Sequence, residues 1–360
     1  MKIALISLQS RSSQMIGEAL KKYFDVVEDV DIRKIEVNLA AGKLDVLYDG
    51  NEFGKYDCIF ARGSFRYAPL LRSITDALSP YSYMPIKAGA YTLGHDKLLT
   101  HLALQERKIP MPKTYITATP EAAKKILEKI NYPIIMKFPS GTGGKGVMFA
   151  ESFAAASSIL DALVTLRQPF IIQEYVETGG IDIRAIVVGD RVVASMKRKA
   201  DIGEKRANIH AGGVGEAVML DAHTKNIAIE TAKAINAEVC AVDILESPKG
   251  PLVVEANLSP GLQGITKATG IDVADHIAKY LFERTKESKE KGTQKKTMEI
   301  MEELGVEKRG VQEILTNLDI RTGRTILPKI VTEIGKLDTE HEYIIRVRAG
   351  KVVIEKSNIS

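Results

Sequence analysis

Residues 137–147 read KFPSGTGGKGV, where a lysine ends a buried strand and a loop with four glycines leads into the next strand. Glycine lets the backbone approach a polyphosphate closely and point its N–H groups at oxygen atoms. Lys137 adds a positive charge at the strand end. The loop is not of the Walker A type, because no Gly-Lys-Ser or Gly-Lys-Thr sequence opens a helix here. Taken alone, the stretch predicts either a phosphate-binding loop or a flexible hairpin with a surface lysine.

The segment around this loop, residues 90–175, is predicted to alternate helices and strands. Pro110 and Pro112 mark an interdomain turn within it. The predicted elements are a helix at 95–107, strands at 113–117, 134–137 and 170–174, and a helix after Pro120.

Residues 1–85 have a similar rhythm. Apolar strand-like runs at 2–8 and 57–61 flank an amphipathic stretch at 14–23. This order predicts a small open α/β domain with a parallel sheet.

Residues 181–287 are predicted to form hairpins packed against helices. Gly189-Asp190 is a two-residue hairpin signal between strands at 183–188 and 191–196. In that hairpin we expect Asp182 to lie opposite Lys197. A helix at 224–235, strands at 239–245 and 252–256, and a helix at 273–286 complete the segment.

The end of the chain differs in composition. Residues 285–297 are polar, interrupted by glycine and mostly basic, which is typical of an exposed linker. A short helix and strand-like runs near 325–330 and 343–354 predict a small α+β module after it.

Three oxygen-bearing side chains lie on the second strand pair of residues 181–287. If a tight turn near Pro248 joins those strands, Asp243 faces Glu255, and Asn257 projects on the same side as Glu255. Two facing carboxylates repel each other unless a cation lies between them. Oxygen ligands of this kind suit Mg²⁺. The alternative is a pair of solvated carboxylates, although Glu255 lies in an apolar run where an unpaired charge is costly.

A cationic group precedes these carboxylates. It comprises Arg184, Lys197, Arg198 and Arg206, with Asn208 and His210 nearby. Residues 206–213 end in paired glycines and have no strong periodicity, which suits a mobile loop over a site. Phosphoryl transfer depends on positioning and charge neutralisation, so arginines are expected there. Ordinary surface basic residues are an equally good interpretation of this group alone.

The composition is that of a globular protein of two or three domains. The chain has 360 residues, 45% of them hydrophobic and 27% charged, and its net charge of +4 does not indicate nucleic-acid binding over the whole surface. The N-terminus lacks the pattern of a signal peptide, and no apolar run is long enough to span a bilayer. Cys58 and Cys240 lie in apolar runs and are expected to be reduced core residues. We therefore predict a cytoplasmic protein that does not bind membranes.

In their order along the chain, these pieces resemble the ATP-grasp fold and, within it, the RimK-like alpha-L-glutamate ligase family. The resemblance is good over roughly residues 85–285 and loose before them. Order and spacing carry it, since no single motif is decisive. The matching residues are His95-Asp96-Lys97, Lys137 with its loop, Gln173-Glu174-Tyr175-Val176, Asp182-Ile183-Arg184, Met196-Lys197-Arg198, Arg206-Ala207-Asn208-Ile209-His210 with Gly212-Gly213, Asp243, and Glu255-Ala256-Asn257-Leu258-Ser259-Pro260-Gly261.

The resemblance implies an α/β and α+β fold in five parts. They are an N-terminal α/β domain at 1–88, a first ATP-grasp subdomain with the glycine-rich loop at 89–178, a second with the Mg²⁺ site at 179–287, a linker at 288–297, and an appended module at 298–360. Within the module, residues 325–329 show a short similarity to AbrB-like modules, some of which bind DNA. Dimerisation or a lid role is an equally good interpretation of the module.

The resemblance also implies which residues bind ATP. The two lysines would hold the phosphates, residues 174–176 would form the hinge that meets adenine, and Asp182 would lie near the ribose. The implied ATP-binding residues are Lys97, Lys137, Gly141, Gly143, Gly144, Glu174, Tyr175, Val176, Asp182, Ala207 and Asn208.

Metal, catalytic and substrate roles follow in the same way. Asp243, Glu255 and Asn257 would hold Mg²⁺, as two ions, with Mn²⁺ as a substitute. Arg198 and Arg206 would be catalytic, because they would steady the transferred phosphoryl group. Arg62 and Arg184 are the expected substrate residues. Arg62, in Ala-Arg-Gly-Ser at a strand end, is a candidate carboxylate clamp, with an isolated surface arginine as the alternative.

The implied reaction has two steps. A carboxylate attacks the γ-phosphate of ATP to give an acyl phosphate, and the amine of an amino acid then displaces phosphate. The added amino acid would be L-glutamate or a relative, and the acceptor a protein C-terminus, a coenzyme or a carrier protein. A homo-oligomer is expected, with nucleic acid bound only through the C-terminal module if at all. The alternative function is an ATP-binding regulator whose C-terminal module contacts DNA or a partner.

Overall fold

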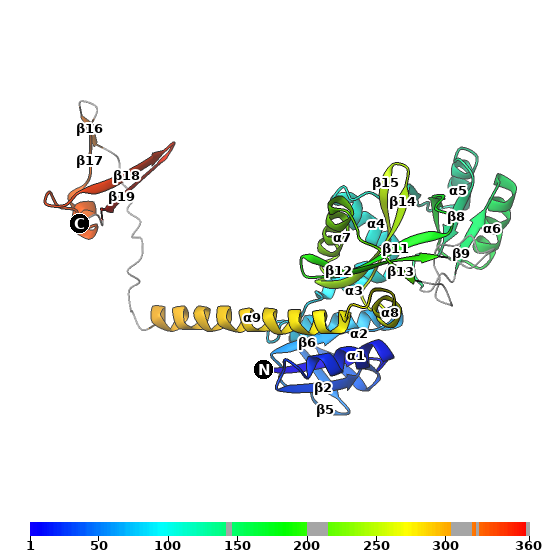
Figure 1. The fold of residues 1–360 in the computed structure, drawn as a ribbon, viewed down its shortest axis with the longest axis horizontal. Coiled ribbons are helices and arrows are strands. Elements are labelled where there is room, and N and C mark those ends of the chain that lie inside the picture. The colour runs from blue at the N-terminus through cyan, green and yellow to red at the C-terminus, as the bar shows by residue number, and fades with distance from the viewer. Residues whose placement is uncertain (142–145, 200–214, 304–318, 322–323, 358–360) are drawn as a thin grey trace. The chain divides into compact units, whose positions relative to one another are not determined.

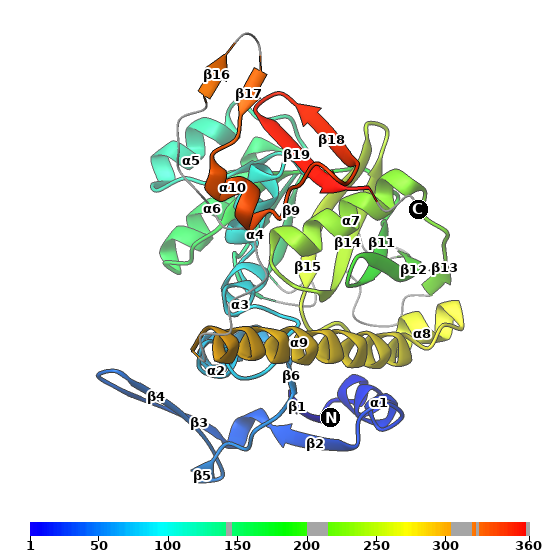
Figure 2. The same cartoon turned by 90° about the vertical axis from the view of Figure 1, so that its left-hand side faces the viewer.

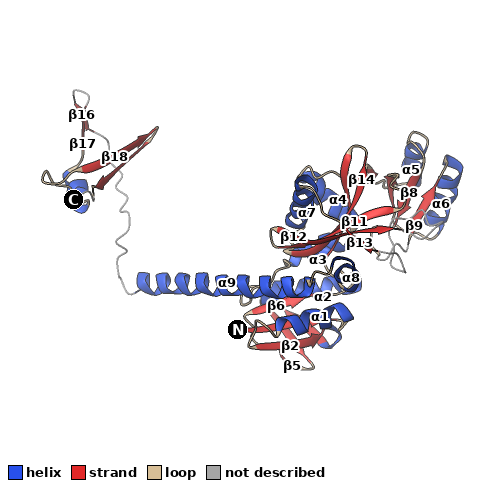
Figure 3. Cartoon of the chain, viewed as in Figure 1, coloured by secondary structure: helices blue, strands red, loops and turns tan. Residues whose placement is uncertain are grey.

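The computed structural model describes residues 1–141, 146–199, 215–303, 319–321 and 324–357. They divide into two units, Met1–Gln294 and Lys295–Ser360, which are described separately below. Helices and strands mix in both units (Figure 3). Within these described ranges no helix combines the length and apolar character needed to cross a membrane.

The first unit begins with a parallel sheet of order β2-β1-β6. The strands are β1 (Lys2–Ser7), β2 (Val26–Asp31) and β6 (Cys58–Ala61), with helix α1 (Arg11–Leu20) after β1 and helix α2 (Ala68–Leu78) after β6. Residues 3–6 of β1 are fully buried, as expected for a strand with a neighbour on each side. The predicted open α/β arrangement is confirmed. An antiparallel meander was not predicted: β3 (Ile35–Ala40), β4 (Lys43–Tyr48) and β5 (Asn51–Glu52).

Next along the chain come two helices and a four-stranded antiparallel sheet of order β7-β10-β8-β9. The predicted helix at 95–107 is present from Lys97 to Glu106, where the Asp96 carboxylate caps its start by accepting hydrogen bonds from the N–H groups of Leu98 and Leu99. A further helix, at 88–95, directly precedes it. The sheet has its own small core, which includes Leu127, Met136 and Leu160. The elements are α3 (Ala88–His95), α4 (Lys97–Glu106), β7 (Thr114–Tyr115), α5 (Pro120–Leu127), β8 (Ile134–Lys137), β9 (Val147–Ala150), α6 (Phe153–Thr165) and β10 (Ile171–Glu174).

A five-stranded antiparallel sheet of order β13-β12-β11-β14-β15 follows (Figure 1). Its strands are β11 (Ile181–Val188), β12 (Arg191–Lys199), β13 (Gly215–Ala217), β14 (Val239–Ser247) and β15 (Gly250–Asn257). Helices α7 (Ala222–Ala234) and α8 (Gln263–Thr269) pack on it. Both predicted hairpins are present.

The register of the first hairpin corrects one expectation. Asp182 lies opposite Arg198, not Lys197. The turn at Gly189-Asp190 sets the expected register near the hairpin tip, but a β-bulge next to Ile186 shifts it by one residue farther along the strands. A shift of one residue brings Arg198 beside Asp182.

One apolar core joins the N-terminal sheet to the five-stranded sheet. It includes Leu5 of β1 together with residues of β11 and β14, and both free cysteines, Cys58 and Cys240, are buried in it as expected. The Tyr91 hydroxyl donates to the Ala61 carbonyl at 2.7 Å, and the Ser12 hydroxyl donates to Gln263 Oε1 at 2.7 Å. Shared packing and these hydrogen bonds therefore hold the N-terminal sheet and the five-stranded sheet in place against each other.

Helix α9 (Val273–Glu303) corrects the expected linker, because residues 288–297 continue the helix. The ring of Phe282 packs against the rings of Tyr23 and Phe24, and Lys289 Nζ lies 2.8 Å from Asp57 Oδ1. These contacts hold the first-unit part of α9 beside the N-terminal domain (Figure 1 and Figure 2). The five-part domain division itself stays a prediction.

The described residues of the second unit form an α+β module. It contains β16 (Asp319–Arg321), β17 (Arg324–Ile326), α10 (Lys329–Ile334), β18 (Tyr343–Arg348) and β19 (Lys351–Lys356). The strand expected at 325–330 ends at Ile326, and α10 begins at Lys329 after Pro328. Strands β18 and β19 pair as a hairpin, in line with the strand-like pattern at 343–354.

Candidate active site

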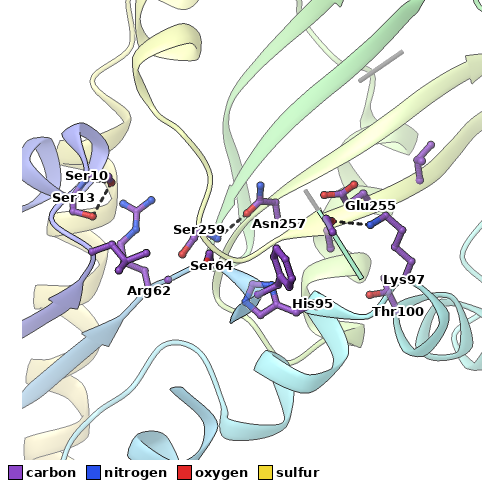
Figure 4. A pocket seen from close by; sticks show the side chains of 17 residues that line it. Ser10, Ser13, Arg62, Ser64, His95, Lys97, Thr100, Glu255, Asn257 and Ser259 are labelled. Carbon is purple, nitrogen blue, oxygen red and sulfur yellow. Dashed lines mark hydrogen bonds between the residues drawn. The ribbon is translucent and has the colours of Figure 1, made fainter. Parts of the chain in front are cut away.

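Two neighbouring cavities lie in the first unit and share part of their walls. The smaller, about 80 Å³, lies between the four-stranded and five-stranded sheets. The larger, about 250 Å³, lies between the N-terminal sheet, α3 and the end of β15 (Figure 4). Lys97, Val254 and Glu255 line both. A group transferred from one cavity to the other would pass these three residues.

The smaller cavity is a slot with apolar walls and a polar edge. Ile135, Val147 and Leu245 supply apolar surface, and residues 174–176, at and just after the end of β10, line the edge. The Tyr175 ring meets the Phe149 ring edge to face, with 5.0 Å between centroids. Such a slot suits a flat heterocycle whose edge can meet the backbone groups of residues 174–176. The expected hinge residues Glu174, Tyr175 and Val176 and the expected ribose residue Asp182 all line it.

Lys137 ends β8 inside this slot and is only 3% exposed. Its Nζ donates to Gln173 Oε1 at 2.9 Å, and Gln173 Nε2 donates to Thr114 Oγ1 at 2.7 Å. Burial, together with the charge of Lys97, lowers the pKa of Lys137 to about 7 against the opposing effect of Glu255. Among the described residues the ammonium is therefore held in position without a carboxylate bonded to it, which leaves it available to an anion.

This lowered pKa predicts proton uptake on nucleotide binding. Near pH 8 Lys137 is mostly neutral in the free chain, and a bound phosphate raises its pKa, so binding should take up most of one proton. Calorimetric titration of ADP at pH 8, in buffers of different ionisation enthalpy, measures the uptake.

Lys137→Arg is the control, because arginine stays charged and should remove the uptake while keeping the binding. Equal uptake by both proteins would contradict the assignment of the proton to Lys137.

Lys97 links the helix α4 to the glycine-rich loop. Its backbone N–H donates to the Pro139 carbonyl and its Nζ donates to the Gly141 carbonyl, both at 2.9 Å. Gly141 also lines the larger cavity, with a φ of 135° that favours glycine. The expected loop residues Gly143 and Gly144 lie outside the described residues, as do Arg206, Ala207 and Asn208.

Two aspartates and two arginines form a buried cluster on β11, β12 and β14. Arg184 binds Asp243 through two hydrogen bonds, Nε to Oδ1 at 2.9 Å and Nη2 to Oδ2 at 2.8 Å. Arg198 binds Asp182 in the same two-pronged way and also lies 2.9 Å from Asp243 Oδ2. Burial raises the pKa of Asp243, but the two arginines outweigh that effect and hold it below its usual range. Burial outweighs Arg198 at Asp182 and raises the pKa of that carboxyl to about 6. The hydrogen bonds fix the four side chains against one another.

The side chains of both arginines in this cluster are bonded to carboxylates of the protein. Arg184 was expected to bind substrate and Arg198 to be catalytic, yet neither is among the described residues that line the cavities. Their guanidinium groups are occupied by Asp243 and Asp182. The bulge and the register across β11 explain the difference, because they turn both arginines toward buried carboxylates. In this structure both arginines orient Asp243, which is likewise not among the described residues that line the cavities, and their substrate and catalytic roles stay predictions.

Asp243 and Glu255 face each other as expected, but through a β-bulge between Asp243 and Ile244 as well as the turn. Asp243 lies opposite Glu255 across β14 and β15, and Asn257 follows two residues later. Three of the roughly four lone-pair positions of Asp243 are taken by arginine N–H groups, which leaves one on Oδ1. Asn257 Oδ1 accepts from the Ser259 N–H at 2.9 Å and keeps its second lone pair.

These donors fit a hard cation. Oxygen atoms from two carboxylates and one amide, with phosphate oxygens nearby, are what Mg²⁺ prefers. The described residues contain no cluster of three His, Cys, Asp or Glu side chains placed for a metal. A cation held by Asp243 and Glu255 would therefore need the Asn257 amide and ligands from a substrate to complete its coordination shell.

The larger cavity contains residues to which sequence reasoning gave no site role, although His95 and Ser259 lie in matched motifs. Ser10 and Ser13 reach it from the start of α1, His95 from the end of α3, and Ser259 from the loop after β15. Burial lowers the pKa of His95 to about 4, and its Nε2 has no hydrogen-bond partner among the described residues. The available signal was topological: Ser10 and Ser13 follow the carboxyl end of a parallel strand, where ligands commonly bind.

Comparison with known proteins decides the family. Residues 94–281 match the model of the RimK-like ATP-grasp domain. A probable alpha-L-glutamate ligase of Vibrio cholerae serotype O1 is 35% identical over 289 residues, which are 78% of this chain and 95% of that protein. A protein of the same name from Methanococcoides burtonii is 33% identical over 296 residues, which are 81% and 98% of the two chains. The chain belongs to the RimK-like ATP-grasp family.

Solved structures agree with this assignment at the level of the fold. The RimK domain protein of Sphaerobacter thermophilus has a TM-score of 0.61 at 22% identity and covers 78% of this chain and 99% of its own. The ATP-grasp ligase PsnB, complexed with a phosphomimetic variant of its minimal precursor, Mg and ADP, has a TM-score of 0.63 at 17% identity, covering 79% and 98%. The expected ATP-grasp fold is confirmed, and the chain is an ATP-grasp ligase.

Proposed function

We propose that this RimK-like ligase uses ATP and Mg²⁺ to join L-glutamate, or a related amino acid, to a carboxylate-bearing acceptor through an acyl phosphate. One observation carries the proposal: the nucleotide slot and the larger cavity meet at Lys97 and Glu255. That junction is where an acceptor carboxylate in one cavity would meet the γ-phosphate of a nucleotide in the other. Relatives named as probable alpha-L-glutamate ligases support glutamate as the added amino acid.

The side chains at the junction suit this chemistry. Lys97 and Lys137 would hold the phosphate oxygens, and the loop around Gly141 would cover them. The acceptor carboxylate would attack phosphorus while the leaving ADP stays on the lysines. An amine entering the larger cavity would then displace phosphate and form the amide bond.

Asp243, Glu255 and Asn257 would hold Mg²⁺, as two ions, with Mn²⁺ as a substitute. When bound, the cation supplies charge neutralisation for the phosphates. Arg184 and Arg198 would keep Asp243 ionised and pointed at the site. Arg206, Ala207 and Asn208 retain the phosphoryl-steadying and ATP-binding roles that the family pattern implies.

Nucleotide products test the proposal. The chain is incubated with Mg-ATP, a panel of amino acids and mixed small carboxylates, and the nucleotides are separated by chromatography. ADP and phosphate that form only when one amino acid is present would support the acyl-phosphate route and identify that amino acid. AMP and pyrophosphate would instead indicate an adenylate and overturn the proposed chemistry.

We also propose that the chain is a homo-oligomer, formed through one face of the β18–β19 hairpin. No residue of the second unit is buried among those described, and an isolated two-stranded hairpin is marginal in water. Ile345, Val347, Val352 and Ile354 pair across the strands on one face, and Val347 is 72% exposed. A second copy offers the same apolar face, to which this one can pair.

The full chain is therefore expected to sediment as an oligomer, and Val347→Lys is expected to shift it toward the monomer. Arg348→Ala, on the opposite face of the hairpin, is the matched control and should leave the mass unchanged. A monomeric wild-type chain at tens of micromolar would contradict this prediction.

We also propose that the protein is cytoplasmic. The two free, buried cysteines support this location.

A further inference from the structure

The end of the larger cavity far from Lys97 is dominated by one buried arginine. Arg62, just after β6, is 4% exposed, and its Nη2 donates to the Pro260 carbonyl at 2.8 Å. Its Nη1 is buried and has no hydrogen-bond partner within the described residues. Burial lowers the pKa of Arg62 to about 10, so the group stays charged near neutral pH. A buried cation without a carboxylate partner is costly unless a ligand supplies the anion.

The start of helix α1 faces the same end of the cavity. Ser10 caps this ten-residue helix by accepting from the Ser13 N–H, and both serines line the cavity. The first turn of α1, which is described throughout, contains no acidic residue. A helix N-terminus carries partial positive charge that favours an anion. Figure 4 shows Arg62, Ser10 and Ser13 together at one side, with Lys97 and Glu255 at the other.

The cavity thus has two poles with different chemistry. At one pole Lys97 and Glu255 border the nucleotide slot, where the reacting carboxylate must lie if the proposed ligase reaction holds. At the other pole the guanidinium of Arg62 and the N-terminus of α1 both favour an anion. An arginine fork matches a carboxylate in geometry. The volume of about 250 Å³ suits a small substrate that reaches from one pole to the other.

We propose that Arg62 and the N-terminus of α1 bind a second, non-reacting carboxylate of a substrate. This inference rests on the proposed ligase function and adds a specificity to it: the substrate must carry a carboxylate besides the group that reacts. Two sources share this chemistry, the α-carboxylate of the incoming amino acid and a spare carboxylate of the acceptor. His95, Ser64 and Ser259 line the path between the poles.

The test is equilibrium binding to the full chain by calorimetry, in the presence of Mg²⁺ and AMPPNP. The probes are L-glutamate, its α-amide, and glutarate with its monoamide. Each amide removes one carboxylate and keeps the size of the molecule. Binding of AMPPNP is measured in every protein as well, so that failure of the nucleotide site is distinguished from failure of the carboxylate site.

Two variants act on the site in different ways. Arg62→Met removes the charge at similar length. Ser10→Asp keeps a good helix cap and places a carboxylate of the protein itself at the anion site, so the fold should be retained. Arg66→Met, on an exposed arginine four residues away that does not line the cavity, is the control.

We expect Arg62→Met and Ser10→Asp each to weaken the binding of one dicarboxylate probe, L-glutamate or glutarate, at least about tenfold, because charged hydrogen bonds are lost. If the variants weaken the binding of L-glutamate only, and the wild-type chain binds the α-amide weakly, the site belongs to the amino acid. If the variants weaken the binding of glutarate only, and the wild-type chain binds the monoamide weakly, the site belongs to the acceptor. Binding of both probes that changes less than about twofold in both variants, or no binding of either to the wild-type chain despite bound AMPPNP, would overturn the proposal.

Discussion

Replacing Glu255 with glutamine is expected to lower ATP turnover by roughly 10³-fold, because several kcal/mol of charge stabilisation would be lost with one carboxylate ligand. Glu255 lines both cavities, faces Asp243 across the strand pair, and raises the pKa of Lys137. A neutral amide at this position binds a hard cation more weakly and withdraws that support from the lysine. Release of ADP at increasing Mg²⁺ concentration measures the effect, and high Mg²⁺ should restore part of the activity.

The matched control is Glu246→Gln. Glu246 lies on β14 in the same strand pair, but its carboxylate is exposed and bonded to Lys197 at 2.9 Å. Its loss should cost no more than an ordinary surface ion pair. If the two variants turn over ATP at similar rates, Glu255 is not a ligand for the cation.

Replacing Asp243 with asparagine is expected to destabilise the chain by about 3–5 kcal/mol, the cost of breaking a buried ion pair from one side. Arg184 would lose its two-pronged partner and Arg198 one of its two contacts, and both guanidinium groups would stay buried. Urea unfolding without nucleotide or metal measures this cost separately from any effect on catalysis. Because folding lowers the pKa of Asp243, its stabilising contribution should decline as pH falls below the ordinary value of 3.8.

Asp190→Asn is the comparison for this second experiment. Asp190 is at the hairpin tip, and its contact with Arg191 is exposed on both sides. A change of less than about 0.5 kcal/mol is expected there. A similarly small change for Asp243→Asn would show that the buried cluster is dispensable for stability. Arg184→Met should fall between the two, because Asp243 keeps Arg198 as a partner.

Local sequence patterns predicted much of the fold and part of the site. The apolar runs near β1 and β6 predicted the parallel sheet, and the turn residues predicted both hairpins. The turn residues predicted that β14 and β15 pair, but a β-bulge between Asp243 and Ile244 decides that Asp243 faces Glu255, because the turn register alone would put Asp243 opposite Val254. The slot residues at 174–176 and the strand-end Lys137 also lie where the motifs indicated.

Other features could not be read in this way. The meander of β3, β4 and β5 was missed, and a basic, polar stretch expected as a linker is helical because it continues α9. Helix propensity is high for Lys and Glu, so the charge pattern alone does not separate a linker from an exposed helix. The partner of Arg198 depended on a β-bulge between β11 and β12, and the partner of Arg184 on the register of β11 against β14; neither has a clear signature in the sequence.

The sequence by itself determined the order of the motifs, the two hairpins and the set of oxygen donors, because each follows from residue spacing within a short segment. Only the tertiary structure decided which charges meet. The bulge beside Ile186 brings Arg198 to Asp182, and the packing of the N-terminal sheet on α3 and β15 leaves Arg62 buried at a cavity without a carboxylate partner among the described residues. Such encounters join residues far apart in the chain, and their outcome depends on register and packing that no local pattern records.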